Sequence, residues 1–384
     1  MEQGKKRNSK TIKIGGFDHV KAVLLGGDYP VVIQTMWKDR LSFQDLEGKA
    51  AEALVSRIDN LSRMGCGLLR FAVPASEDAE IIGNLAGMVS MPIVADIHFD
   101  YKIALRCMDF PIAKLRINPG NIGGKEKLRA VLEKAASKSI PIRIGVNGGS
   151  LPAGLRSAPH TPLPNPHSAP AGSYSQAEAL VLAAEREIAL FNEFGFSGFM
   201  VSMKASSVAD TIKANRIFSA RSDAPLHIGV TEAGPLIAGV VRNTAAILEL
   251  LKDGIGDTIR VSLSDTVERE VITAREILGV IEGRNAGVRI VSCPRCGRSG
   301  FDTHGFTDRW QERLYVLDKD ITVAVMGCAV NGPTEARHAD LGITGAGDKV
   351  LIFRRGEIVR TINAAEADAV FEEELEKIFN EEHG

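Results

Sequence analysis

The sequence predicts an α/β protein in which a TIM (β/α)8 barrel is followed by a small α+β domain. From about residue 30 to residue 282, short runs rich in β-branched residues alternate with segments of helical periodicity. Eight such strand–helix pairs over roughly 250 residues are typical of a TIM barrel. The alternative is a doubly wound open sheet, which would place a Gly-x-Gly-x-x-Gly turn after the first strand, and the sequence has none there.

Each expected strand of the barrel is a short apolar run, and the expected helices lie between these runs. The strands are predicted at 31–35, 66–73, 92–97, 113–117, 140–146, 198–203, 226–230 and 258–262. The helical segments include 45–64, 126–138, 176–194, 205–219 and 236–251. Two earlier runs, 11–14 and 20–25, predict a small hairpin that closes the floor of the barrel. We therefore expect residues 1–282 to form one domain.

Residues 283–384 are expected to form the second domain, because about a hundred residues can carry their own core. Its predicted elements are a strand at 288–292, a helix near 310–317, a strand at 321–326, a strand pair at 350–353 and 358–360, and a charged helix from Ala364. These elements predict a small mixed sheet covered by helices.

A proline-rich segment, residues 152–170, interrupts the barrel pattern directly after the fifth strand. It holds six of the sixteen prolines of the chain. One interpretation is an extended loop of no special role. The other is a lid, because the segment leaves the C-terminal face of the barrel, where active sites of this fold lie.

Composition excludes several classes of partner. The net charge of −2 over 384 residues gives no reason to expect nucleic acid or an anionic membrane. No stretch approaches the roughly 18 apolar residues of a membrane span, and no secretory signal is recognisable. An odd number of cysteines, five, favours metal or redox use in a reducing cytoplasm over a disulfide framework.

The ends of the predicted strands carry charged and amide side chains. They are Gln34, Arg70, Asp96 with His98, Arg116 with Asn118, Arg143 with Asn147, Lys204, Glu232, and Arg260 with Ser262. Five of these residues are cations, against Asp96, Glu232 and possibly Asp265, and buried cations must be paired or await an anion. Arginine suits phosphate oxygens, so the pattern predicts a site for a ligand with several negative charges. Asp96, His98 and Glu232 are the candidates for proton transfer or hydroxyl contacts.

Two cysteine clusters near the C-terminus predict a metal site. Cys293 and Cys296 form a C-x-x-C after a strand, and Cys328 follows another strand. The turn after Cys328 brings Glu335 back towards it, so the fourth ligand is Glu335, a histidine (His304 or His338) or water. A structural zinc and an iron–sulfur cluster with one unusual ligand both remain open, and the missing fourth cysteine favours the cluster. Cys66 and Cys107 are expected to be ordinary buried cysteines.

Taken together, these residues resemble those of the 4-hydroxy-3-methylbut-2-enyl diphosphate synthases, which are iron–sulfur enzymes of the methylerythritol phosphate route to isoprenoids. The motifs that carry the resemblance are VADIHFD at 94–100, LRINPGNIG at 115–123, IRIGVN at 142–147, VSMKAS at 201–206, TEAG at 231–234, GIGDTIRVS at 254–262, CPxC at 293–296 and GCxVNGPxEA at 327–336. They run in the order of the family from about residue 30 to residue 345.

The resemblance implies a TIM barrel and a sulfite-reductase-like domain with a [4Fe–4S] cluster held by Cys293, Cys296, Cys328 and Glu335. It implies reductive opening of 2-C-methyl-D-erythritol 2,4-cyclodiphosphate, with a flavodoxin or ferredoxin as electron donor and a homodimeric enzyme. The matching positions assign substrate binding to Arg70, His98, Arg116, Arg143, Asn147, Lys204, Arg260, Ser262 and Asn331. Glu232 would act near the reduced carbon, with Asp96 near a substrate hydroxyl.

One departure from the family pattern concerns the cluster loop. The family usually has glycine where this chain has Thr334, next to the expected ligand Glu335. A glycine there would serve a positive φ or a close approach, and threonine tolerates neither well. The alternative function is a phosphate-binding barrel of the pterin-synthase type with a structural zinc domain.

Overall fold

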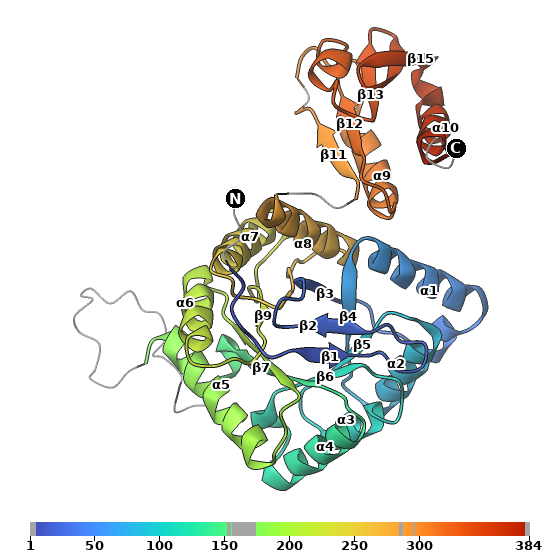
Figure 1. Ribbon diagram of the computed structural model, residues 1–384. Helices are drawn as coiled ribbons and strands as arrows, with labels where there is room; N and C mark the ends of the chain where they lie inside the picture. The colour runs from blue at the N-terminus through green and yellow to red at the C-terminus, as the bar shows by residue number, and fades with distance from the viewer. Residues whose placement is uncertain (1–4, 152–154, 156–173, 284–286, 295, 381–384) are drawn as a thin grey trace. The chain divides into compact units, whose positions relative to one another are not determined.

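The computed structural model describes residues 5–151, 155, 174–283, 287–294 and 296–380. It divides the chain into two compact units, Met1–Gly283 and Arg284–Gly384. The first unit contains the barrel, and the second contains a separate sheet with helices (Figure 1).

The first unit confirms the predicted barrel. Its eight parallel strands pair in the order β8-β7-β6-β5-β4-β3-β10-β9, and a parallel bridge between Val201 and Leu226 brings β9 back to β8. The strands are β3 (Val32–Met36), β4 (Cys66–Ala72), β5 (Ile93–Ile97), β6 (Lys114–Ile117), β7 (Ile142–Asn147), β8 (Phe199–Lys204), β9 (His227–Ile228) and β10 (Thr258–Ile259). The last two strands are shorter than the sequence predicts.

Helices surround the strands, as Figure 1 shows. They are α1 (Gly48–Arg63), α2 (Ser76–Met88), α3 (Tyr101–Cys107), α4 (Lys125–Ser137), α5 (Gln176–Glu193), α6 (Val208–Ser219), α7 (Leu236–Lys252) and α8 (Val267–Glu282). Each follows a strand and buries an apolar stripe. In α1, for example, Leu54, Ile58 and Leu61 recur at helical spacing and are buried.

A hairpin of β1 (Ile12–Ile14) and β2 (Val23–Leu25) closes the floor of the barrel, as predicted. Its apolar residues form one cluster with residues at the starts of the barrel strands. Those strand residues are Leu68, Val94 and Met200, with Ala113 just before β6. The floor of the barrel is therefore apolar.

The interior of the barrel changes from apolar to charged along β4, β5 and β8. Side chains two residues apart face the same side of a strand. Beyond Leu68 on β4 comes Arg70, and beyond Val94 on β5 comes Asp96. Beyond Met200 on β8 come Ser202 and Lys204. Charge is therefore concentrated towards the carboxyl ends of the strands.

The second unit is a five-stranded mixed sheet in the order β11-β12-β13-β14-β15. Its strands are β11 (Arg289–Ser292), β12 (Thr322–Met326), β13 (Leu341–Ala346), β14 (Lys349–Arg354) and β15 (Glu357–Asn363). The first three strands are parallel, and β14 and β15 run antiparallel to their neighbours. Helices α9 (Thr303–Tyr315) and α10 (Ala367–Asn380) contribute Phe306, Trp310 and Phe371 to its core. The sequence did not predict β13.

The proline-rich segment 152–170, including His160 and His167, lies outside the described residues except for Leu155, which is buried. In the part of the chain that is described, no helix has the length and hydropathy needed to cross a membrane.

Candidate functional site

Asp96 lies at the centre of a group of cationic side chains in the barrel. Its carboxylate is 3.0 Å from Nη1 of Arg116 and 3.6 Å from Nε of Arg70. Nε2 of His98 is 3.6 Å from Asp96 and 2.7 Å from Nη1 of Arg116. The structure thus brings together four residues that the sequence assigned to the site.

Burial and charge act in opposite directions on this group. Burial alone would raise the pKa of Asp96, but Arg70, the contact with His98, and Arg116 lower it well below its usual range. Burial lowers the pKa of Arg70 to about 10, and the charges of Arg260 and Arg116 add to this effect while Asp96 opposes it. Asp96 therefore stays ionised and can accept hydrogen bonds.

Arg116 has room in the barrel because the neighbouring strand carries a glycine. A Cβ atom placed on Gly145 of β7 would stand 2.3 Å from Nε of Arg116. Any larger residue would displace the guanidinium from Asp96. This close approach explains why the IRIGVN motif has a glycine at position 145.

Arg143 is buried with most of its donors unused. Its Nη1 donates to Oγ of Ser202 at 3.1 Å, while its Nε and Nη2 are buried without a hydrogen-bond partner. The Nε atoms of Arg70, Arg116 and Arg260 are also buried without such a partner. Buried donors that lack partners are costly, and these guanidinium groups could still donate to an acceptor with several oxygens.

Lys204 and His227 form a buried pair on β8 and β9. Nζ of Lys204 is 3.1 Å from Nε2 of His227, and Nδ1 of His227 is 2.7 Å from Oγ1 of Thr258. Burial, followed by the charges of Arg143 and Arg260, lowers the pKa of Lys204 well below its usual value. Burial and the charge of Lys204 lower the pKa of His227 in the same way. A neutral imidazole is therefore the acceptor for the lysine.

Lys114 is a buried cation that the sequence reasoning missed. It begins β6, is 0% exposed, and its Nζ donates to Oε1 of Gln34 at 2.7 Å. Gln34, which we expected at the barrel mouth, lies instead in the interior and holds this lysine. Burial and the nearby Arg143 and Arg70 lower the pKa of Lys114 well below its usual value.

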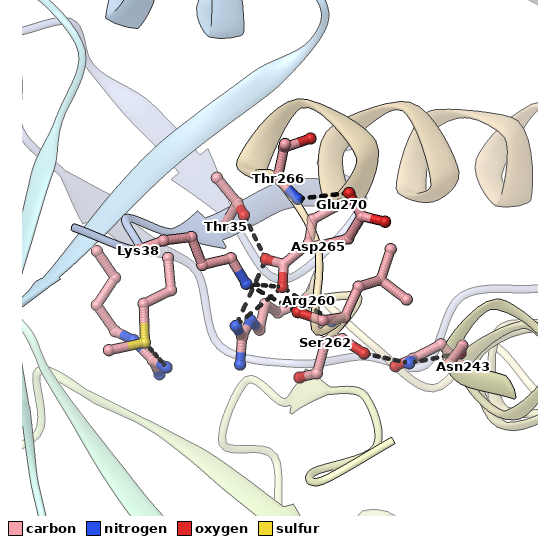
Figure 2. Close-up of polar contacts among 12 residues, drawn as sticks. Thr35, Lys38, Asn243, Arg260, Ser262, Asp265, Thr266 and Glu270 are labelled. Carbon is pink, nitrogen blue, oxygen red and sulfur yellow. Dashed lines mark hydrogen bonds and ion pairs between the residues drawn. The ribbon is translucent and has the colours of Figure 1, made fainter. Parts of the chain in front are cut away.

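Glu270 is a second buried charged residue that the sequence reasoning missed. This carboxylate, in the first turns of α8, is 1% exposed and accepts hydrogen bonds from Oγ1 of Thr35 at 2.6 Å and from the Leu263 amide at 2.9 Å. It also bonds Nζ of Lys38 at 2.5 Å and Nη2 of Arg260 at 3.1 Å, as Figure 2 shows. Glu270 therefore balances Arg260, a role for which we had considered Asp265.

Asp265, Ser262, Asn147 and Glu232 lie at the other strand ends. Asp265 pairs with Arg269 at 3.1 Å rather than with a barrel cation. Oγ of Ser262 is buried without a hydrogen-bond partner, and Asn147 ends β7. Glu232 is exposed in the loop after β9 with a φ of 53°, a left-handed conformation that costs a non-glycine residue about 1–2 kcal/mol. Local strain of this kind is typical of functional loops.

Three thiols line one pocket in the second unit. Cys293, Cys296 and Cys328 surround a cavity of about 180 Å³ together with Arg298 and Gly327. The Gly327 amide donates to Sγ of Cys293 at 3.0 Å. Hydrogen bonds from the backbone and side chain of Arg298 lower the pKa of Cys296. Both features favour thiolates, the form in which cysteine binds metal.

The three thiols of this pocket are candidate metal ligands. Within the described ranges, no three His, Cys, Asp or Glu side chains lie close enough together to hold a single metal ion. Cys66 and Cys107, by contrast, are buried in the barrel unit, and burial raises the pKa of each to about 12, as expected for unreactive thiols.

A π-helical turn, Asn331–Glu335, follows Cys328. The Gly332 amide donates to the Cys328 carbonyl at 3.0 Å, which folds the turn back beside the thiol. Thr334 has no positive φ and its side chain is exposed, so threonine meets neither difficulty expected from the sequence. Glu335 is exposed at the end of the turn and is not among the residues lining the thiol pocket. Single π-turns are frequent at functional sites.

Comparison with known proteins decides the family. The description "GcpE TIM-barrel domain" matches residues 17–275, and "GcpE protein C-terminal domain" matches residues 289–377. The chain belongs to the GcpE family. This confirms the resemblance seen in the sequence and disfavours a pterin-synthase-like barrel with a structural zinc.

GcpE relatives match over nearly their whole length. A protein of Treponema pallidum is 51% identical over 379 residues, which cover 96% of this chain and 92% of the relative. A protein of Treponema denticola is 48% identical over 387 residues, covering 96% and 98%. Both are named 4-hydroxy-3-methylbut-2-en-1-yl diphosphate synthase (flavodoxin).

Glu270→Ala should destabilise the GcpE barrel strongly. The change leaves the Arg260 and Lys38 charges and the Thr35 hydroxyl without their shared acceptor, and losing one partner of a buried ion pair costs about 3–5 kcal/mol. Urea unfolding would measure this cost. Glu268→Ala, two residues away and paired with the half-exposed Arg57, is the control and should cost much less. Equal losses would contradict the central role of Glu270.

Lys204→Met should change how stability depends on pH. The folded pKa of Lys204 lies below the unfolded one, so between these values the unfolded chain binds more protons. The free energy of unfolding then rises with pH through this window, which ends near the unfolded lysine value of about 10.4. Removing Lys204 should flatten this rise by up to about 1.4 kcal/mol per pH unit.

The measurement is urea unfolding of the ligand-free protein at several pH values between neutrality and the unfolded lysine pKa. Lys213→Met, on the outer surface of α6 in an exposed pair with Glu178, is the matched control. A K204M profile parallel to that of K213M would show that Lys204 does not carry the effect.

Proposed function

We propose that this chain catalyses the reductive ring opening and dehydration of 2-C-methyl-D-erythritol 2,4-cyclodiphosphate to (E)-4-hydroxy-3-methylbut-2-enyl diphosphate. The observation that carries the proposal is the set of buried guanidinium groups with unused donors in the barrel. A cyclic diphosphate supplies the acceptor oxygens that these donors lack. The names of the Treponema relatives support the same reaction.

The reaction consumes two electrons and one proton. The bond between a ring carbon and a diphosphate oxygen breaks, and that oxygen keeps a negative charge on the diphosphate. A hydroxyl on the neighbouring carbon takes up the proton and leaves as water while the carbon–carbon double bond forms. The product therefore carries one more negative charge than the substrate, and a cationic barrel stabilises it.

We propose that Arg70, Arg116, Arg143, Lys204 and Arg260 bind the diphosphate. The arginines offer paired N–H groups that match two oxygens of one phosphate. The buried positive charge is only partly balanced by Asp96 and Glu270, so an anion would relieve mutual repulsion. Ser262 and His98 would add hydrogen bonds to the same ligand.

Asp96, Asn147 and Glu232 are proposed to act on the carbon skeleton. The lowered pKa of Asp96 makes it a hydrogen-bond acceptor for a substrate hydroxyl. Asn147 would orient the ring. Glu232, exposed on its strained loop, would transfer the proton that turns the leaving hydroxyl into water.

The residues proposed to hold a [4Fe–4S] cluster are Cys293, Cys296 and Cys328, with Glu335 as the fourth ligand and Asn331 nearby. When bound, such a cluster supplies electrons one at a time and a Lewis-acidic iron. A carboxylate is a harder ligand than a thiolate, so Glu335, at the end of a short turn, would be the exchangeable ligand of such a cluster. Residues 1–282 would thus bind the diphosphate, and residues 283–384 would carry the cluster.

We further propose a flavodoxin or ferredoxin as electron donor, a homodimer and a cytoplasmic location. The names of the Treponema relatives specify flavodoxin. Unpaired cysteines suit a reducing compartment. The homodimer follows from the family resemblance.

The deciding experiment combines anaerobic visible spectroscopy, iron and sulfide analysis and turnover of the cyclodiphosphate with a reduced flavodoxin. Brown protein with about four irons and four sulfides per chain, and product formation, are expected. Cys328→Ser should lose both the spectrum and turnover, whereas Cys66→Ala, in the barrel, should keep the cluster. Colourless protein with one zinc would overturn the proposal.

Glu335→Ala should leave a cluster that is labile or spectroscopically altered and should slow turnover severely, because an iron loses its protein ligand. Iron content over time in air and the turnover rate are the measurements. Glu357→Ala, an exposed carboxylate that begins β15, is the control and should behave as the unmodified protein does. Normal turnover in E335A would exclude the carboxylate as the fourth ligand.

A further inference from the structure

We propose that Lys38 is a further ligand of the diphosphate, held beside Arg260 by the carboxylate of Glu270. This inference rests on the proposed function, because it extends the same anion site. Lys38 is not one of the strand-end residues that the sequence motifs single out. The inference is drawn from the contacts that Lys38 makes beside the paired strands β3 and β10.

Lys38 stands at the mouth of the barrel. It lies two residues beyond the end of β3, and β3 pairs with β10, the strand that leads to Arg260. Its Nζ contacts Oε1 of Glu270 at 2.5 Å and the Leu263 carbonyl at 3.0 Å. The lysine is therefore fixed on the rim next to the proposed anion site.

Lys38 and Arg260 are neighbours because they share one acceptor atom. Nη2 of Arg260 contacts the same Oε1 of Glu270, at 3.1 Å (Figure 2). Two positive charges thus meet one negative charge. Arg260 alone would balance Glu270, so the lysine leaves an excess of positive charge at this position.

The ammonium group also has a donor to spare. A lysine ammonium has three N–H donors, and the two contacts to Glu270 and Leu263 use two of them. The Lys38 side chain is 29% exposed while that of Glu270 is 1% exposed, so a ligand can approach the lysine from the mouth. Nε of Arg260 is buried without a hydrogen-bond partner beside it. Together they offer donors to adjacent oxygens of one anion.

The test is calorimetric binding of the cyclodiphosphate to the complete, cluster-loaded protein under anaerobic conditions without reductant. Lys38→Met should weaken binding about tenfold, the usual effect of losing a charge-assisted hydrogen bond. Lys38→Arg should recover most of the affinity. Arg40→Met is the matched control, because Arg40 is on the same loop but 72% exposed and paired with Asp78.

A double-mutant cycle separates direct binding from an effect through Glu270. In a Glu270→Gln background, K38M should still weaken binding about tenfold if Lys38 contacts the ligand. If the loss disappears in that background, Lys38 acts only by balancing Glu270 and the inference is wrong.

The remaining outcomes are also decisive. If the unmodified protein binds the cyclodiphosphate and K38M binds as tightly as R40M, the inference fails while the proposed function stands. If the unmodified protein does not bind the cyclodiphosphate at all, the proposed function and the inference fail together. A thermal unfolding midpoint of K38M close to that of R40M would show that the affinity change is not a loss of fold.

Discussion

The positive charge buried inside the barrel is the constraint on which the rest of this structure depends. Within the described part of the barrel, its members are Arg70, Lys114, Arg116, Arg143, Lys204 and Arg260. Desolvation makes each of them costly, and among the residues that the structure describes Asp96 and Glu270 oppose them with full charges. Uncharged residues beside these cations accommodate them without adding further positive charge. Gln34 receives a hydrogen bond from Lys114, His227 faces Lys204 as a neutral imidazole, and Gly145 leaves space for Arg116. The anion binding proposed above would offset part of this electrostatic cost.

The two units prepare their ligands by different physical means. In the barrel, the parallel strands direct long charged side chains into one interior, so the sheet sets the positions of these side chains. In the second unit, short turns after β11 and β12 present the thiols, and backbone amides such as that of Gly327 stabilise the sulfur atoms. Rigid strands hold the charged side chains of the barrel in place, whereas the thiols and the turn Asn331–Glu335 belong to the connections after β11 and β12.

Much of this organisation could be predicted from the sequence, because parallel strands bring their carboxyl ends to one face. Arg70, Asp96, Arg116, Arg143, Lys204 and Arg260 follow directly from that rule. Glu270 could not be found in this way, since it lies on a helix and reaches Arg260 and Thr35 only through the fold. Lys114 could not be found by the same rule, because it is the first residue of β6 rather than the last. How deeply its side chain is buried depends on how far β6 is shifted along its neighbouring strands. Strand β9 is shorter than predicted because Gly229, with a φ of 145°, leaves the strand conformation. Glycines at 342 and 345 weaken the β-strand signal of β13.

The hairpin on the floor of the barrel limits the routes by which a ligand could reach the barrel interior. Ile12, Ile14 and Leu25 seal one end with apolar side chains that no diphosphate can cross. The barrel is thus closed by apolar side chains at its floor and lined by charged side chains at its opposite end. Because apolar side chains close the floor, a ligand that reached the arginines through the charged end would have to leave through the same end.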